Sequence, residues 1–316
     1  MPDLPSFAQL PAGEHGEPRA WQLFGSDDNI GLINLLTPEV VLTAARLVRQ
    51  GKVFPLNAPL DLFAPPPFAG RGVPRRSVRT RERPATTTLD DCLDNFFPQG
   101  SSQWDSLAHV ALRPGQFYNG VSHDDVLTRH RNTIDHWAQR GIVGRGVVLD
   151  LTVDRELYDP GSSCAFTVDD LERARQRQGI TYQRGDILIF NTGFAAWFAE
   201  QTEERRTALQ KAVAAPGLDH SKEVVAYLWD HHFSAVASDT LAVEAFPYDP
   251  AEAAMPYGFL HQTLIGGFGM ALGELWWLQD LVADCRSDGV YEVMLVSAPA
   301  HIRGGMGSPA NAIAIK

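Results

Sequence analysis

The sequence VVLDLTV at residues 147–153 decides the fold, because it is a short apolar run of the kind that forms a strand. Two runs of the same character follow it, DILIF at 186–190 and SAVASD at 234–239. Patterns with helical character lie around and between them, at 167–178, 194–200, 203–212 and 220–231. Strands that alternate with helices predict an α/β domain.

The first half of the chain is less regular than this alternating part. Thr37 and Pro38 predict the start of a helix that Gly51 ends, with apolar residues at helical spacing between them. Residues 54–90 are expected to form loops, and a second helix is expected at 124–140.

The end of the chain returns to strands. A segment at 267–284 has a helical tail, and two apolar runs follow it, YEVMLVSAP at 291–299 and NAIAIK at 311–316. We therefore expect an extended segment at 1–20, followed by a single α/β domain at 21–316 with mixed sheet pairing.

Composition excludes several classes of function. The 316 residues carry a formal net charge of −11, which argues against general binding of nucleic acid or anionic membranes. Residues 71–83 are the exception, with six arginines and one glutamate. This segment is a solvated loop or hairpin, or else an anion-facing lid or a subunit contact. We expect a cytoplasmic protein with no secretory signal and no membrane-spanning segment.

Familiar catalytic motifs are absent. The chain has no phosphate-binding glycine motif and no G-x-S-x-G nucleophile motif. Its three cysteines are widely separated, which predicts buried apolar residues rather than disulfides or a nucleophile. Histidines and carboxylates are therefore the candidates for chemistry.

The first candidate site is FPQGSSQWDSLAH at residues 97–109. Asp105 and His109 lie four residues apart, and on a helical turn they would share one face. Gln99 and Gln103 continue the same spacing upstream. A carboxylate with an imidazole is the minimum set for metal ligation or for an oriented general base.

The second candidate pair is His261 and Glu274. Glu274 lies in the apolar sequence LGELWWL, and a buried carboxylate without a partner is costly. An arginine such as Arg145 or Arg303 would satisfy it in a purely structural arrangement, whereas a cation or a catalytic proton would satisfy it in a functional one. Asp239 ends an apolar strand, where sites of α/β proteins gather, and is a further candidate.

Six blocks of sequence, in this order along the chain, carry a resemblance to a known family. They are FGSDDNIGLINLLTPE (24–39), GIVGRGVVLDL (141–151), GDILIFNTG (185–193), AVASDT (235–240), LHQTLIGGFGMALGELWWLQDL (260–281) and SAPAHIRGGMGSPANAIAI (297–315). Through these blocks the chain resembles, over roughly residues 21–316, the metal-dependent cyclase family, which includes bacterial kynurenine formamidases and isatin hydrolases. The resemblance implies a swivelling β/β/α fold with a mixed sheet or barrel flanked by helices, and a homodimer or homotetramer.

The family's signature is H-x-x-x-H-x-D-x-x-x-H, followed downstream by a histidine and a glutamate. Its two ligand histidines fall on Gln99 and Gln103, its aspartate on Asp105 and its catalytic histidine on His109. The downstream pair falls on His261 and Glu274, with one more residue between them than the family pattern suggests.

The replacement of two ligand histidines by Gln99 and Gln103 affects which metal ion the site would bind. An amide oxygen suits hard cations and replaces imidazole poorly on zinc. We expect one divalent ion, manganese or zinc, held by Asp105, His261 and Glu274 with help from Gln103.

The resemblance implies three alternative functions. The first is a hydrolase that opens an amide, lactam or lactone of a small cyclic or aromatic substrate through metal-activated water, with His109 as general acid/base. The second is a cyclase, dehydratase or isomerase that works without a metal, and the third is a non-catalytic binding protein. The expected substrate contacts are Gln99, Gln103, Trp104 and Tyr118.

Overall fold

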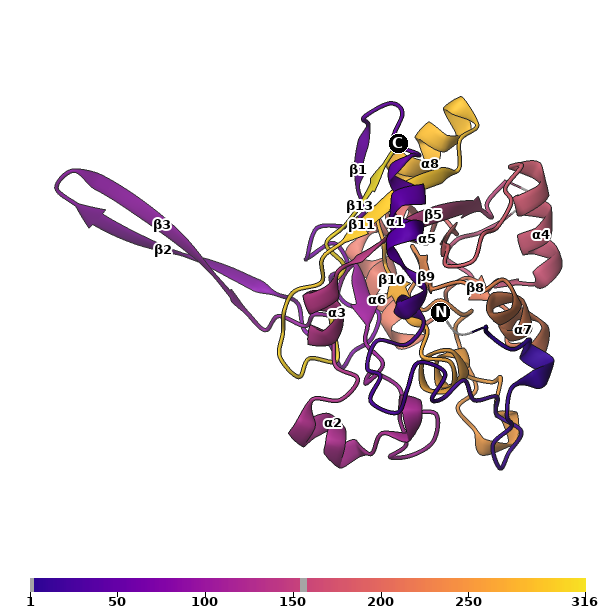
Figure 1. The fold of residues 1–316 in the computed structure, drawn as a ribbon. Helices are drawn as coiled ribbons and strands as arrows, with labels where there is room; N and C mark the ends of the chain where they lie inside the picture. Colours follow the sequence, from indigo (N-terminus) through magenta and orange to yellow (C-terminus); the bar gives the residue numbers. More distant parts are fainter. Residues whose placement is uncertain (1–2, 154–157) are drawn as a thin grey trace.

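The computed structural model describes residues 3–153 and 158–316, and it is built around a nine-stranded sheet (Figure 1). In spatial order the strands are β1 (Val53–Pro55), β13 (Ala312–Ile315), β11 (Glu292–Ser297), β5 (Ile142–Asp150), β7 (Ile187–Asn191), β9 (Ala235–Ser238), β10 (Ala271–Glu274), β4 (Gln103–Asp105) and β12 (Gly307–Pro309). The centre of this sheet is parallel, from β5 through β7 and β9 to β10. Both flanks are antiparallel, which confirms the predicted α/β fold with a mixed sheet.

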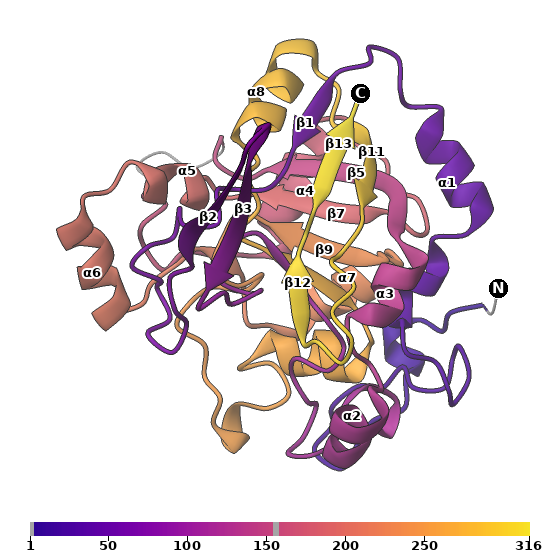
Figure 2. The same ribbon diagram turned by 90° about the vertical axis from the view of Figure 1, so that its left-hand side faces the viewer.

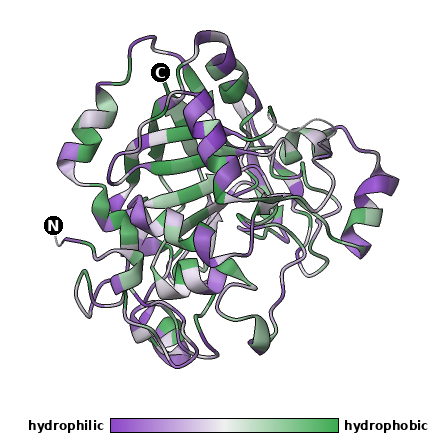
Figure 3. Cartoon of the chain, turned by 90° about the vertical axis from the view of Figure 1, so that its right-hand side faces the viewer, coloured by the Kyte–Doolittle hydropathy of each residue, from purple (hydrophilic) through white to green (hydrophobic). Residues whose placement is uncertain are grey.

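Helices flank the curled sheet, whose central strands are coloured mostly as hydrophobic in Figure 3. The α-helices are α1 (Pro38–Ala45), α2 (His123–Arg129), α3 (Asp135–Arg140), α4 (Val168–Arg177), α5 (Phe194–Ala199), α6 (Glu203–Lys211), α7 (Lys222–Asp230) and α8 (Gln279–Asp288). Threonine or serine side chains cap several of them, as Thr37 does for α1. None of the described helices is both long enough and apolar enough to cross a membrane.

Short turns of helix supplement these elements. They are η1 (Phe7–Gln9), η2 (Gly31–Leu35), η3 (Tyr118–Gly120), η4 (Glu252–Ala254) and the π-helical turn η5 (Gln262–Gly267). A small separate pair of strands joins β6 (Ala165–Phe166) to β8 (Gly217–Leu218) in parallel.

The predicted helix at 124–140 is wrong in its middle. The chain forms α2 and α3 instead, because His130 and Asn132 adopt left-handed conformations with φ of 53° and 65°. Such backbone angles end a helix.

The predicted loop at 54–90 is also wrong in part. Residues Arg75–Arg83 form strand β2, which pairs antiparallel with β3 (Thr86–Asp94). This two-stranded ribbon projects away from the rest of the molecule, and Figure 2 views it from its outer end. The arginine-rich segment is therefore a hairpin for most of its length.

A buried arginine links three elements of the sheet. Arg145 in β5 donates to Asp186 at 2.7 Å and to Glu292 in β11 at 3.0 Å. Burial raises the pKa of Asp186 to about 6, although the attraction of Arg145 acts in the opposite direction. Arg145 is thus committed to these two carboxylates and is not the partner of Glu274.

We predict that Arg145→Met lowers the free energy of unfolding by about 3–5 kcal/mol at pH 8, because it leaves Asp186 buried without its counter-charge. The folded state binds the Asp186 proton more readily than the unfolded chain does, so stability falls as pH rises from about 4 to 6. Without Arg145 this pKa rises further, so the loss should be smaller at pH 5 than at pH 8.

Urea unfolding at the two pH values measures this difference. The control is Arg129→Met, which removes an exposed ion pair with Asp125 and should cost no more than about 1 kcal/mol. A loss in the Arg145 variant that does not depend on pH would contradict the role assigned to Asp186.

Candidate metal centre

The pairing of two short strands places the first carboxylates of the site. In the antiparallel register of β4 and β10, Gln103 lies opposite Glu274 and Asp105 lies opposite Leu272. Residues two apart on a strand share one face, so Asp105 and Glu274 are diagonal neighbours on the same face. The helical turn predicted from the spacing of Asp105 and His109 does not form at Asp105, which is the last residue of strand β4. Strand pairing brings Asp105 close to Glu274 instead.

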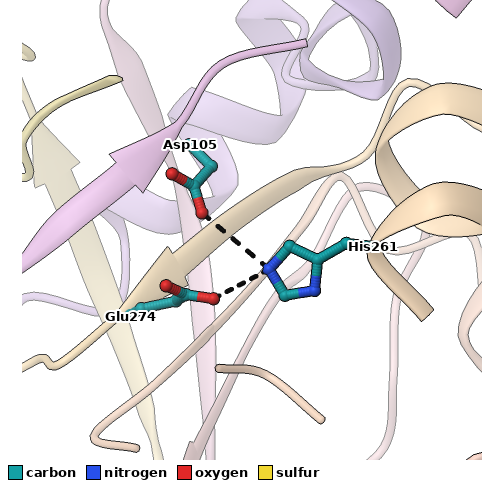
Figure 4. Close-up of side chains that lie close together, drawn as sticks. All are labelled: Asp105, His261 and Glu274. Atoms are coloured by element: carbon teal, nitrogen blue, oxygen red, sulfur yellow. Dashed lines mark hydrogen bonds and ion pairs between the residues drawn. The ribbon is translucent and has the colours of Figure 1, made fainter. Parts of the chain in front are cut away.

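His261 completes a cluster with these two carboxylates (Figure 4). It directly precedes the π-helical turn η5, and its Nε2 lies 2.9 Å from Glu274 Oε1 and 3.9 Å from Asp105 Oδ2. One ligand atom from each of Asp105, His261 and Glu274 lies within 4.8 Å of the others, and all three residues are buried. The structure thus gathers Asp105, His261 and Glu274, three of the four residues that the family resemblance implied as metal ligands.

Glu244 fixes the orientation of the His261 ring. The Nδ1 of His261 hydrogen-bonds to Glu244 Oε1, and the backbone N–H of His261 donates to the same oxygen at 3.0 Å. His220 Nε2 lies 3.0 Å from the other oxygen of Glu244, as an ion-pair contact without the alignment of a hydrogen bond. With Nδ1 held in this way, Nε2 is the nitrogen that faces the two carboxylates, as in metal centres with a carboxylate behind the histidine.

The cluster has more negative than positive groups. Burial and the neighbouring Asp105 raise the pKa of Glu274, and His261 only partly opposes them. Burial alone would lower the pKa of His261, but its hydrogen bonds with Glu244 and Glu274 raise that pKa well above the ordinary value. Among the described residues, the buried oxygens Asp105 Oδ2 and Gln103 Oε1 accept no hydrogen bond.

These features fit a divalent cation. Carboxylate, amide and imidazole donors suit a hard or intermediate ion, and the two unpartnered oxygens offer it lone pairs. Gln103 is held by its Nε2, which donates to Glu274 Oε2 at 2.6 Å. Asp105, His261 and Glu274 would hold the ion, and Gln103 Oε1 is the additional donor.

Gln99 connects the carboxylate cluster to His109. Its Nε2 donates to Asp105 Oδ1 at 2.9 Å and lies 2.8 Å from His109 Nδ1. An amide N–H directed at Nδ1 makes this nitrogen the acceptor, so the ring carries its proton on Nε2. His109 Nε2 is 3.6 Å from Asp105 Oδ1, which is longer than a normal hydrogen bond and leaves this N–H free for a substrate atom.

A cavity of about 300 Å³ opens above this cluster. His109, His261 and Glu274 form its polar wall, while Arg71 and a group of apolar side chains form the rest. The apolar group consists of Phe68, Leu241, Ala242, Phe246, Tyr248 and Phe259. A larger hollow of about 570 Å³ lies near Gln201, Glu203 and Arg206, but the smaller cavity is the candidate site because it contains the histidines and Glu274.

Aromatic rings give the cavity flat walls. Tyr248 stacks on Phe259 with ring centroids 4.1 Å apart, and Phe259 stacks on His261 at 5.0 Å. On another side the Arg71 guanidinium lies over the ring of Phe68, 5.1 Å from its centroid. Aromatic rings and one guanidinium therefore line the cavity beside the two histidines.

Trp104 and Tyr118 were expected to contact the substrate, but neither is among the described residues that line this cavity. Trp104 points to the opposite face of β4 from Gln103 and Asp105, where it packs edge-on against Trp276 and donates to Ser297. Tyr118 is buried and its hydroxyl donates to Asp28 at 3.1 Å. Both residues therefore serve the core, because strand alternation and local packing turn them away from the site.

Asp239 also has a structural environment. It accepts hydrogen bonds from Thr192 N at 2.7 Å, from Thr192 Oγ1 at 2.8 Å and from Ala195 N at 3.4 Å. Burial raises its pKa to about 6 despite these bonds. The hydrogen bonds of Asp239 connect the end of β9 to the start of α5.

Sequence reasoning missed Glu244 and Arg71. Glu244 lies in AVEAF, an apolar context in which a buried carboxylate needs a partner, so the argument applied to Glu274 would have found it. Arg71 was hidden in the arginine-rich segment 71–83, and nothing local distinguishes it from the exposed arginines that follow.

Comparisons with known proteins agree with this architecture. The family model described as "Putative cyclase" matches residues 56–245. A crystal structure of a novel cyclase is 29% identical, with a TM-score of 0.82 over 94% of this chain and 99% of that chain. Among curated proteins no match was found.

Two isatin hydrolases are more distant and share the fold. Isatin hydrolase A from Ralstonia solanacearum is 18% identical, with a TM-score of 0.55 over 88% of this chain and 97% of that chain. An isatin hydrolase bound to the product analogue thioisatinate is 17% identical, with a TM-score of 0.57 over 83% and 91% of the two chains. The family model itself spans more than half of the present sequence, and the chain therefore belongs to the cyclase family.

Proposed function

We propose that this protein is a metal-dependent hydrolase that opens an amide, lactam or lactone bond in a small, flat substrate. The observation that carries this proposal is the buried group of Asp105, His261 and Glu274, in which an oxygen of Asp105 has no hydrogen-bond partner among the described residues. Structural groups of this kind are normally satisfied, so an unpartnered buried carboxylate oxygen points to a cation.

The residues of the cluster would hold one divalent ion, manganese or zinc. When bound, such an ion polarises a carbonyl and lowers the pKa of a coordinated water. Glu244 keeps the His261 ring in place, and the Gln103 amide keeps Glu274 in place, so the donor atoms are arranged before binding. This arrangement favours a single ion.

His109 is the residue that we assign to proton transfer. It borders the cavity, and its Nε2–H has no close acceptor in the cluster. In hydrolysis a water oxygen bonds to the carbonyl carbon while the bond from carbon to nitrogen or oxygen breaks. The departing atom needs a proton, and His109 Nε2 supplies it and later recovers one from water.

The lining of the cavity supports a small, flat substrate. Stacked rings at Tyr248 and Phe259 offer a planar surface next to the His261 imidazole. Arg71 supplies a guanidinium to the lining, so a carboxylate or a second carbonyl on the substrate would lie toward it. The isatin hydrolases that share this fold are named for isatin as their substrate. The cavity of about 300 Å³ is compatible with a molecule of the size of isatin.

A second candidate is a cyclase, dehydratase or isomerase that works without a metal. The specific observation in its favour is the position of His261, which bridges Glu274 at 2.9 Å and Glu244 on its other nitrogen. As an imidazolium it would take the place of a cation between the two carboxylates. Asp105 and His109 would then act as an oriented acid/base pair.

A non-catalytic binding protein is the third alternative. In that case the cavity would bind a small molecule, replacing His109 would leave ligand binding intact, and no lactone or amide would be turned over. Activity against any member of a panel of lactones, cyclic imides and aryl formamides excludes it.

We predict that the protein stripped with chelator binds one Mn²⁺ or Zn²⁺ per chain, measured by elemental analysis. Binding should also raise the melting temperature, since an ion present at 100 times its Kd adds about 2.7 kcal/mol of stability. Asp105→Asn should abolish uptake. The control Asp91→Asn makes the same change at an exposed position and should bind normally.

The result that would end the metal hypothesis is a wild-type protein with no stoichiometric ion and no change in melting temperature with either metal. The metal-free alternative would then remain.

We predict that Glu244→Gln weakens metal affinity by about 10- to 100-fold, because the ring of His261 loses its charged partner. Titration of the stripped protein with a competing chelator measures the affinity. Glu223→Gln changes an exposed glutamate of α7 in the same way and serves as the control. Equal affinities in both variants would show that Glu244 does not orient a metal ligand.

We predict that His109→Ala keeps stoichiometric metal and loses about 10²- to 10⁴-fold in kcat, because proton transfer is lost while the ligand set is intact. Turnover of the best substrate from the panel gives kcat, and elemental analysis gives the metal content. His123→Ala removes an exposed histidine and should retain full activity. A His109 variant with full activity would refute the assigned role.

A further inference from the structure

Arg71 lines the cavity but forms no ion pair with a carboxylate of the described chain. Its guanidinium lies over the ring of Phe68, and its Nη1 donates to the carbonyl oxygen of Gln99. By contrast, the buried Arg145 pairs with Asp186 at 2.7 Å. The charge of the half-buried Arg71 is therefore available to a ligand in the cavity.

The surrounding backbone holds Arg71 in place. The N–H of Arg71 donates to the carbonyl oxygen of Phe68 at 3.0 Å, which closes a turn. Asn95 Nδ2 donates to Val73 O at 3.2 Å, so the base of the β2–β3 ribbon restrains the residues that follow Arg71. A cationic group that is positioned before binding loses little freedom when a ligand arrives.

One edge of the Arg71 guanidinium remains for that ligand. The N–H groups on Nε and Nη2 donate to no described residue, because the hydrogen bond to Gln99 uses Nη1. Neighbouring N–H groups on one edge match the two oxygens of a carboxylate and make two parallel, charge-assisted hydrogen bonds. A neutral carbonyl offers one oxygen and no charge, so a carboxylate is the better match.

The acidic cluster determines which way such a ligand lies. Glu274 and His261 line the same cavity, and Asp105 is next to them. Burial and the neighbouring Asp105 raise the pKa of Glu274, and the charge of Arg71 is near enough to oppose them. A carboxylate in the cavity is repelled by the acidic cluster and attracted by Arg71, so it lies away from the cluster.

We propose that Arg71 selects substrates that carry a carboxylate at the end remote from the bond to be hydrolysed. The substrate class is a small, flat, monoanionic acid whose ring packs against Tyr248 and Phe259. No lysine and no second arginine is among the described lining residues, so the cavity matches one negative charge and not a phosphate dianion. The inference rests on the proposed function for the hydrolysed bond, whereas the binding of the carboxylate does not depend on turnover.

Naphthoate and naphthamide test the role of Arg71 without any reaction. The two molecules share one flat ring system and nearly the same size, but only naphthoate is charged. In isothermal titration of the purified protein we expect a Kd about 10- to 100-fold lower for naphthoate, because its hydrogen bonds with Arg71 are charge-assisted. In Arg71→Gln the two Kd values should be about equal, with that of naphthamide unchanged.

Two further variants serve as controls. Arg75→Gln makes the same change at an exposed position of β2, and it should keep the full preference for naphthoate. Arg71→Lys keeps the charge and loses the paired N–H groups, so its preference should fall to about 3-fold. The wild type alone already tests the proposal through the two ligands, so the result does not depend on the folding of any variant.

Three outcomes would overturn the proposal. The wild type could bind neither ligand at millimolar concentration, or it could bind both with the same Kd. A preference for naphthoate that survives in Arg71→Gln would place the carboxylate elsewhere, as on a metal ion in the cluster.

Turnover separates this inference from the proposed function. Phthalide is a flat lactone fused to a benzene ring, and its ring can carry either a carboxylate or a neutral carboxamide. The wild type should hydrolyse the carboxylate derivative with a kcat/KM about 10- to 100-fold higher, and Arg71→Gln should lose this ratio mainly through KM. Any disturbance from freeing the Gln99 carbonyl affects both derivatives and cancels in the ratio.

The two results together identify which idea fails. Hydrolysis of both phthalides with equal kcat/KM would overturn the selection by Arg71 and leave the hydrolase standing. A preference for naphthoate that depends on Arg71, without turnover of any lactone, imide or amide, would refute the hydrolase and retain Arg71 as the carboxylate-binding group.

Discussion

Three buried carboxylates around one buried imidazole form the constraint on which the site depends. Asp105, Glu244 and Glu274 all lie within reach of His261, and each of the four is nearly inaccessible to solvent. Burying unbalanced charge is costly, so the fold must supply protons, hydrogen bonds or a cation at this place. The raised pKa values of Glu274 and His261 are two consequences of the same imbalance.

The mixed topology of the sheet creates this imbalance. Parallel pairing carries the sheet from β5 to β10, and Glu274 is the last residue of β10. The antiparallel addition of β4 then places Asp105 diagonally from Glu274, and β12 covers the far edge. Gly307 of β12 permits this close approach, since a Cβ there would lie 2.8 Å from the carbonyl oxygen of Trp104. The site is therefore a product of long-range strand pairing.

This origin explains what the sequence could and could not predict. The parallel strands at β5, β7 and β9 were predictable, because each is a buried apolar run. β4 and β10 have only three and four residues, and their register depends on contacts more than 160 residues apart in the chain. The family pattern grouped Asp105 with His261 and Glu274, whereas local spacing had suggested only a helical turn that carries Asp105 and His109. The β2–β3 ribbon was predicted only as one alternative, a solvated loop or hairpin at 71–83, since an exposed strand has no buried face to favour one of the two.

The two glutamines change what the loop at 97–109 can do. An imidazole offers one donor and one acceptor in a rigid ring, whereas an amide offers two N–H groups and an oxygen. Gln99 uses its N–H groups to join Asp105 to His109, and Gln103 uses one to hold Glu274. Positions that bind a metal in the family pattern thus act here as hydrogen-bonding supports for the remaining donors. Gln99 thereby fixes the proton of His109 on Nε2, and under the proposed function the remaining donors would hold one ion beside this histidine.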